Sequence, residues 1–189
     1  RSSSAASDVY KRQLLLPPFY YKNVTDEGVI NYYRHLIENV GDSELHYVLY
    51  HIPQNTYVPI SFKTIETLLK LYPNNIVGLK DSSGDGERMM KVIKYFNNFS
   101  VFCGHDSLAL SISKRGGAGA ITAGTNVCGK LLSFILKNYK NENSIKNFNE
   151  LQSLLEKIRQ VITSHEPISL MKAYFSIVDN ISEWNNVLP

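Results

Sequence analysis

Lys80 is the side chain of this sequence best placed for covalent chemistry. It ends the apolar run NIVGLK, which we expect to be a buried strand, with Gly78 leaving room beneath the lysine if both residues face inward. Burial disfavours the ammonium form and so lowers the pKa of a lysine. A neutral lysine amine can attack a ketone and form an imine. The alternative is that Lys80 reaches solvent or pairs with the neighbouring Asp81.

Tyr50 is the second candidate, because it lies at the end of the apolar run that precedes the Lys80 run. Neighbouring parallel strands lie about 4.8 Å apart, so the two strand ends can face one pocket. Imine formation and carbon–carbon bond cleavage both need a group that donates and accepts protons, and a tyrosine beside a lysine can do this. The alternative is that Tyr50 is a packed aromatic residue at the rim of the sheet.

The remaining polar and sulfur-containing residues point to no metal or cofactor. The five histidines show no HxH or HExxH spacing, so we expect no metal site, and His51 and His105 are minor pocket candidates. Cys103 and Cys128 have no evident base nearby, and we expect them in the core. The glycine-rich stretch 116–119 precedes a strand, whereas the phosphate loops of barrels follow strands, so a tight turn is favoured over a phosphate site.

Strand and helix patterns alternate along the chain. Helix starts are predicted at Thr25, which precedes Asp26 and Glu27, and at Ser61, because these hydroxyl side chains suit helix N-termini. Each apolar run is followed by a helical pattern, which indicates a parallel α/β sheet. The predicted strands are Leu14–Tyr20, His46–Ile52, Asn75–Leu79, Phe99–Cys103 and Gly119–Ala123.

Two architectures fit this alternation, a doubly wound open sheet and a (β/α)8 TIM barrel. No GxGxxG or GxxxxGK[ST] motif follows a strand, which weakens the nucleotide-binding open sheet. A barrel needs eight units in about 250 residues. We therefore expect residues 14–140 to form an incomplete barrel of about its last five units. Residues 141–189 are expected to form a C-terminal helical region that packs or oligomerises, with Trp184 as an anchor.

The composition excludes several protein classes. The 189 residues are 43% hydrophobic with a net charge of +3, so no basic patch indicates nucleic-acid binding and no apolar run is long enough to span a membrane. Two cysteines are too few for a disulfide scaffold, which favours a reducing cytoplasm. Residues 1–13 (RSSSAASDVYKRQ) are polar and aperiodic. We interpret them as an adaptor or cloning artefact, with the natural N-terminal part missing.

The chain resembles the pyruvate-dependent class I aldolases, the family of dihydrodipicolinate synthase and N-acetylneuraminate lyase. The resemblance runs in order from Leu14 to about Leu170. It is carried by PPFYY (17–21), DEG (26–28), YVLYHIP (47–53), NIVGLKDSSGD (75–85), FCGHD (102–106) and GGAGAITAGTNV (116–127).

This resemblance implies a TIM barrel with a C-terminal helical region, usually a homotetramer, that binds a small-molecule substrate (pyruvate or a 2-oxo acid) and needs no cofactor. Lys80 matches the Schiff-base lysine and Tyr50 the proton-relay tyrosine. Gly104 lies in the loop that matches the lining of the pyruvate site, and Ile121 matches the residue whose backbone carbonyl faces the bound pyruvyl group. Tyr20, or Tyr21 if the loop is counted from its other end, matches a relay tyrosine at a subunit interface.

Two departures from the family pattern bear on activity. The Gly-Thr-Thr motif that binds the pyruvate carboxylate is missing, so residues 1–189 alone are expected to be inactive. Asn55 stands where synthases usually carry an arginine for the second substrate's carboxylate, and Tyr57 follows where the family has a glycine. These changes count against lysine biosynthesis.

Several functions therefore remain open. The favoured one is a synthase-like condensation of pyruvate with an aldehyde, as in 4-hydroxy-tetrahydrodipicolinate synthase. The first alternative is cleavage of a 4-hydroxy-2-oxo acid or sugar acid, of the 4-hydroxy-2-oxoglutarate, 2-keto-3-deoxygluconate or N-acetylneuraminate type. A non-catalytic barrel that serves as a binding module and a nucleotide-binding open sheet are the alternatives from other classes.

Overall fold

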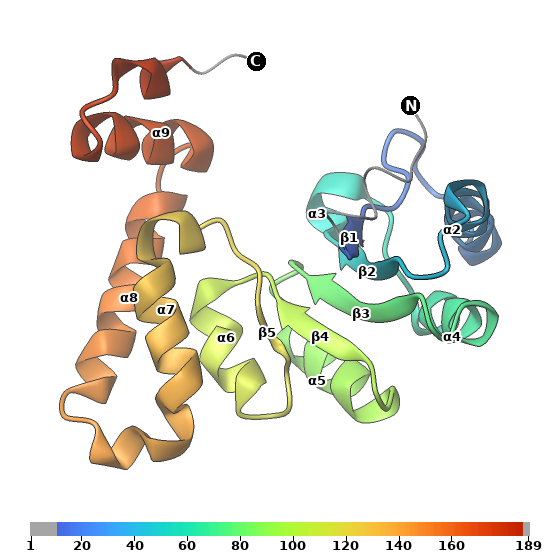
Figure 1. Cartoon of the computed structure of the whole chain (residues 1–189), viewed down its shortest axis with the longest axis horizontal. Helices are drawn as coiled ribbons and strands as arrows, with labels where there is room; N and C mark the ends of the chain where they lie inside the picture. Colours follow the sequence, from blue (N-terminus) through green and yellow to red (C-terminus); the bar gives the residue numbers. More distant parts are fainter. Residues whose placement is uncertain (1–10, 187–189) are drawn as a thin grey trace.

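A five-stranded parallel sheet forms the centre of the protein (Figure 1). The structure is a computed structural model that describes residues 11–186. The strand order is β1-β2-β3-β4-β5, so each strand pairs with its neighbour along the chain. The strands are β1 (Arg12–Leu15), β2 (His46–His51), β3 (Ile76–Asp81), β4 (Ser100–Cys103) and β5 (Gly119–Ala120).

Helices follow the strands and, in Figure 1, α2, α4, α5 and α6 lie along one side of the curved sheet. A doubly wound sheet has a reversal of strand order and helices on both faces, whereas consecutive units of a barrel keep chain order with helices outside. The described residues thus form an arc of a barrel. The helices up to β5 are α2 (Asp26–Val40), α3 (Pro53–Thr56), α4 (Phe62–Leu71), α5 (Gly86–Tyr95) and α6 (Asp106–Ser113).

Local capping interactions fix where the outer helices begin. The Thr25 hydroxyl accepts a hydrogen bond from the Gly28 amide at 3.2 Å, and the Ser61 hydroxyl accepts one from the Thr64 amide at 3.0 Å. Both predicted helix starts are confirmed. A side-chain oxygen at this position satisfies one of the amide groups that the first turn leaves unpaired.

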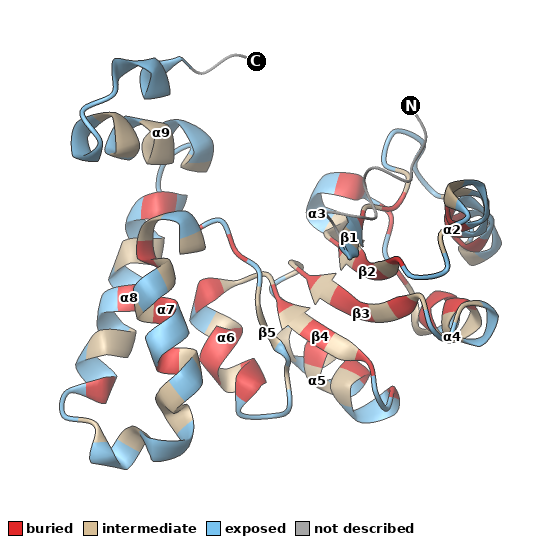
Figure 2. Cartoon of the chain, in the orientation of Figure 1, coloured by how far each residue is buried: buried red, intermediate tan, exposed pale blue. Residues whose placement is uncertain are grey.

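The core has two parts, and the buried strands of the first are visible in Figure 2. The larger part fills the space between the sheet and its helices and includes Cys103. The smaller part lies among α6, α7 and α8 and includes Cys128. Both cysteines are buried and free, which confirms the prediction that they are core residues.

The first strand differs from its predicted extent. It covers Arg12–Leu15 and not Leu14–Tyr20, because Pro17 and Pro18 cannot donate hydrogen bonds to a neighbouring strand. Its first two residues belong to the segment 1–13 that we interpreted as an artefact. Residues 1–10 of that segment lie outside the described part of the chain.

The glycine-rich stretch makes the turn between α6 and β5. Gly116 has a φ of +97°, in the region that favours glycine. A Cβ atom on Gly117 would lie 2.6 Å from the Ile112 side chain, so the turn packs closely against α6 at this residue. The structure therefore agrees with the tight-turn interpretation.

The C-terminal region is helical, as predicted. After α7 (Thr125–Asn138), which follows β5, this region contains η1 (Tyr139–Ser144), α8 (Phe148–Thr163), α9 (Pro167–Val178) and η2 (Ser182–Asn185). In Figure 1, α9 and η2 stand away from the sheet, and α9 has no buried residue. Trp184 packs on Phe175 with ring centroids 5.3 Å apart. No helix between residues 11 and 186 is long and apolar enough to cross a membrane.

Candidate active site

Lys80 and Tyr50 are direct neighbours on adjacent strands. Their Cα atoms are register partners in the β2–β3 pairing, and both residues are half-buried. The Lys80 Nζ atom lies 3.9 Å from the centroid of the Tyr50 ring. The Tyr50 hydroxyl accepts a contact from the Ser82 hydroxyl at 3.5 Å, at the outer limit of a hydrogen bond. The amine thus lies beside a phenol that can exchange protons with a bound molecule.

Asp81 is not the partner of Lys80. Its carboxylate is fully buried and forms an ion pair with Arg88 of α5. The same carboxylate accepts hydrogen bonds from the Ser83 amide at 2.9 Å and the Ser83 hydroxyl at 2.6 Å. Successive side chains of a strand point to opposite faces, so this network lies on the helix side of the sheet. The Lys80 amine is left without this carboxylate.

His51 belongs to the same helix-side network. It is buried, and its Nδ1 atom accepts a hydrogen bond from the Ile60 amide at 3.1 Å. Burial, reinforced by the Arg88 charge, lowers the pKa of His51 to about 4. His51 does not line the cavity that contains Lys80. The prediction that it is a pocket residue is wrong, because the strand alternation turns it away from Tyr50.

A cavity of about 500 Å³ lies at the carboxyl ends of β2 to β5. Residues from four strand ends and from α8 line it. Its size is within the range of small-molecule sites, and strand carboxyl ends are where barrel enzymes bind their ligands. The predicted residues on its wall are Tyr50, Lys80, Gly104, His105 and Ile121.

Two glycines let the strands and loops beneath this cavity come close together. A Cβ on Gly78 would lie 2.4 Å from the carbonyl oxygen of Ser100, so this glycine permits the approach of β4 to β3. A Cβ on Gly104 would lie 2.0 Å from the Ser82 hydroxyl oxygen. Gly78 therefore permits close packing of two strands. The sequence alone predicts only that it leaves room beneath Lys80.

Two predicted residues lie outside the cavity. Asn55 is exposed on α3, and its neighbour Gln54 lines the cavity instead, with its amide donating to the Ser82 carbonyl at 2.7 Å. Tyr20 is 80% exposed in the loop after β1 and packs edge-on against Tyr21. The substrate-binding role of Asn55 and the relay role of Tyr20 stay predictions.

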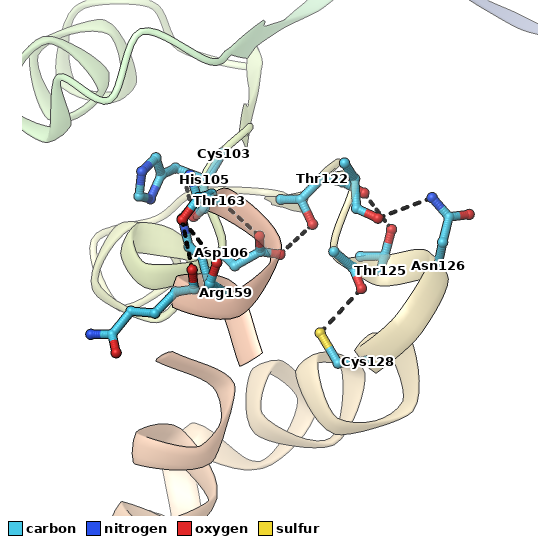
Figure 3. Close-up of polar contacts among 12 residues, drawn as sticks. Cys103, His105, Asp106, Thr122, Thr125, Asn126, Cys128, Arg159 and Thr163 are labelled. Carbon is cyan, nitrogen blue, oxygen red and sulfur yellow. Dashed lines mark hydrogen bonds and ion pairs between the residues drawn. The ribbon is translucent and has the colours of Figure 1, made fainter. Parts of the chain in front are cut away.

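An ion pair that the sequence did not reveal lies on the α8 side of the cavity wall (Figure 3). Arg159 of α8 donates a hydrogen bond to Asp106, at the first turn of α6, with 2.8 Å between Nη1 and Oδ2. The other carboxylate oxygen of Asp106 accepts a hydrogen bond from the Thr122 hydroxyl. Arg159 and Asp106 lie 53 positions apart in the chain, so no local motif signals this contact.

His105 lines the same cavity and, in the described part of the chain, has a buried ring nitrogen without a partner. Its Nδ1 atom is buried and has no hydrogen-bond partner among the described residues. Burial, followed by the charge of Arg159, lowers the pKa of His105. Burial thus favours the neutral form of the ring.

Thiol and metal chemistry find no support among the described residues. Burial raises the pKa of Cys103 to about 11, which leaves little nucleophilic thiolate near neutral pH. Between residues 11 and 186, no group of three or more histidine, cysteine or acidic side chains could hold a metal ion. The amine of Lys80 is the nucleophile that the geometry favours.

Comparisons with known proteins agree on one family. The sequence model of the Dihydrodipicolinate synthetase family matches residues 3–188. An uncharacterized DapA-like lyase of Chloroflexus aurantiacus is 31% identical, over 93% of this chain and 58% of its own length. The 4-hydroxy-tetrahydrodipicolinate synthase of Pelagibacter ubique is 34% identical, over 80% of this chain and 49% of its own length.

Solved structures show the same fold. The 2-keto 3-deoxygluconate aldolase from Picrophilus torridus superimposes with a TM-score of 0.77 at 24% identity, covering 89% of this chain and 59% of that one. The chain thus spans about half to three fifths of the length of these relatives.

Proposed function

Because this chain belongs to the Dihydrodipicolinate synthetase family, we propose that it is part of a pyruvate-dependent class I lyase that works through a Schiff base on Lys80. One observation carries the proposal. The Lys80 amine lies against the Tyr50 ring on the wall of a cavity of about 500 Å³, without the carboxylate of Asp81 as partner.

The chemistry begins with the neutral amine. Lys80 Nζ attacks the ketone carbon of pyruvate, and the resulting carbinolamine loses water to leave an iminium ion. The iminium withdraws electrons, so the adjacent methyl carbon loses a proton and becomes an enamine. The enamine carbon attacks an aldehyde, the new alkoxide takes a proton, and water or an internal amine releases the product from Lys80.

Tyr50 has the position for proton transfer in these steps. Its hydroxyl is on the strand next to Lys80 and contacts the Ser82 hydroxyl. A phenol that donates a proton to the departing oxygen can take one back from the next intermediate. Run in the opposite direction, the same steps cleave a 4-hydroxy-2-oxo acid to pyruvate and an aldehyde.

The first reaction we propose is condensation of pyruvate with an aldehyde, as in the Pelagibacter ubique relative. Cleavage of a hydroxy-oxo acid or sugar acid is the second candidate, and one observation favours it. Asn55, at the position where synthases usually carry an arginine, is uncharged and exposed. The neighbouring Gln54 lines the cavity instead. The two are separated by comparing condensation with aspartate semialdehyde against pyruvate release from 4-hydroxy-2-oxoglutarate, 2-keto-3-deoxygluconate and N-acetylneuraminate.

Trapping with borohydride tests the mechanism. The protein is expressed from its full reading frame, including any upstream sequence in the gene, and is reduced in the presence of pyruvate. We expect one pyruvyl adduct, located on Lys80 by peptide mass spectrometry. Lys80→Ala should abolish the adduct, whereas Lys91→Ala, an exposed lysine of α5, should retain it. An adduct that persists in Lys80→Ala would exclude this lysine as the Schiff-base residue.

The proposal includes a cytoplasmic homotetramer. Two free buried cysteines are compatible with a reducing compartment. The exposed apolar side chains of the C-terminal helices, among them Ile168 and Ile177, support contact with other subunits. Light scattering on the same protein measures the number of subunits.

A further inference from the structure

Arg159 is a guanidinium on the wall of the Lys80 cavity, and it has unused hydrogen-bonding capacity. Its side chain is 22% exposed. Among residues 11–186, the guanidinium makes one side-chain hydrogen bond, from Nη1 to Asp106. An arginine side chain carries five N–H donors in a planar fork. Most of the donors of Arg159 therefore remain available to a ligand.

A buried carboxylate anchors one nitrogen of this guanidinium (Figure 3). Asp106 is 3% exposed, and its two oxygens are occupied by Thr122 and Arg159. Gly124 lies so close that a Cβ atom there would be 2.9 Å from the carboxylate. A carboxylate satisfied and packed in this way is a fixed anchor. It leaves the far edge of the guanidinium free to bind a second carboxylate.

The charges on the wall leave a place for an anion. Asp106 is the one carboxylate among its lining residues, and Lys80 and Arg159 are the two side chains there that form cations. The Asp106 carboxylate contacts one nitrogen of the guanidinium, and Arg159 lines the same cavity as Lys80 with its other N–H groups unpaired among the described residues. At about 500 Å³, the cavity has space for a ligand longer than pyruvate.

We propose that Arg159 binds a carboxylate at the end of the substrate remote from the ketone, so that the site selects 2-oxo acids with two carboxylates. This inference rests on the proposed Schiff base at Lys80 and names the substrate class of that site. A carboxylate bound by Arg159 would not need the uncharged Asn55, which lies outside the cavity. Arg159 is a specificity-determining residue here, because the chemistry itself occurs at Lys80.

A matched pair of ketones tests the proposal without requiring turnover. 2-Oxoglutarate and 2-oxopentanoate have the same chain length and differ in a terminal carboxylate against a methyl group. Each is titrated onto the full protein with borohydride, and the half-saturating concentration for the Lys80 adduct is measured. We expect 2-oxoglutarate to half-saturate at a concentration at least tenfold lower, since hydrogen bonds to charged groups contribute roughly 10- to 100-fold in affinity.

The variants separate selectivity from a purely structural role. Arg159→Gln should bring the ratio of the two half-saturating concentrations to about one, by loss of affinity for 2-oxoglutarate. Because this change leaves Asp106 buried without its partner, Arg159→Met combined with Asp106→Asn removes both charges and should abolish the ratio equally. Arg115→Gln, an exposed arginine that follows α6, is the control and should keep it.

The outcomes distinguish the two proposals. If pyruvate forms no adduct at Lys80, the proposed function fails. If pyruvate is trapped normally but wild type does not discriminate between the two ketones, or if the double variant discriminates as wild type does, the assignment of Arg159 is overturned. A role limited to attaching α8 to α6 would change stability and leave the ratio unmoved.

Discussion

The buried histidine His51 should make the stability of this protein fall as the pH is lowered. The Ile60 amide donates to its Nδ1 atom, so that nitrogen carries no proton in the folded state. Arg88 disfavours a charged ring, and the nearby carboxylates of Asp81 and Asp85 only partly offset it. Protonation in the folded state therefore requires a much lower pH than in the unfolded chain.

The magnitude follows from the two pKa values of His51. Its pKa is about 4 in the folded protein against an ordinary 6.5. Because the folded-state pKa is the lower one, the stabilisation is complete above about pH 6.5 and is lost as the pH falls toward 4. Between about pH 7.5 and pH 5, the unfolded histidine takes up its proton and the folded one does not. The free energy of unfolding should therefore drop by about 2 kcal/mol.

Replacement by asparagine isolates this contribution. In His51→Asn, the side-chain oxygen can still accept the Ile60 hydrogen bond but does not titrate. The free energy of unfolding is measured by urea titration at about pH 7.5 and again at about pH 5. Between these two values it should fall by about 2 kcal/mol less in the variant than in wild type. His165→Asn, at an exposed histidine, serves as the control and should follow wild type. Equal decreases in wild type and His51→Asn would refute the assignment of this pH dependence to His51.

Two further predictions concern one residue on the helix side of the sheet and one on the cavity wall. Asp81→Ala leaves the guanidinium of Arg88, whose side chain is 16% exposed, without its buried carboxylate and should lower the unfolding free energy by about 3 kcal/mol. Asp85→Ala, which removes an exposed helix cap, should cost about 1 kcal/mol in the same urea titration at about pH 7.5. Similar losses in both variants would contradict the buried-pair argument. Gly104→Ala places a Cβ atom 2.0 Å from the Ser82 hydroxyl oxygen. It should destabilise by about 1–3 kcal/mol and reduce the yield of pyruvate trapping, and a variant with wild-type stability and yield would show that this close approach is not required.

Local sequence patterns predicted most of the elements, because strand and helix periodicities and caps act over a few residues. Thr25 and Ser61 mark helix starts that the structure confirms. The errors occurred where an apolar run continued past the last ladder hydrogen bond, as at Pro17 and Pro18. Alternation along β2 also placed His51 on the helix side, a consequence that residue type alone did not reveal.

By itself, the sequence determined the order of the units and the adjacency of Lys80 and Tyr50, because strands that follow one another along the chain pair side by side in a barrel. Only the tertiary structure decided which carboxylate each cation binds. Asp81 pairs with Arg88 across the helix side of the sheet, and Arg159 reaches Asp106 from 53 positions away. Such contacts depend on how whole helices pack, and no short-range pattern in the chain specifies them.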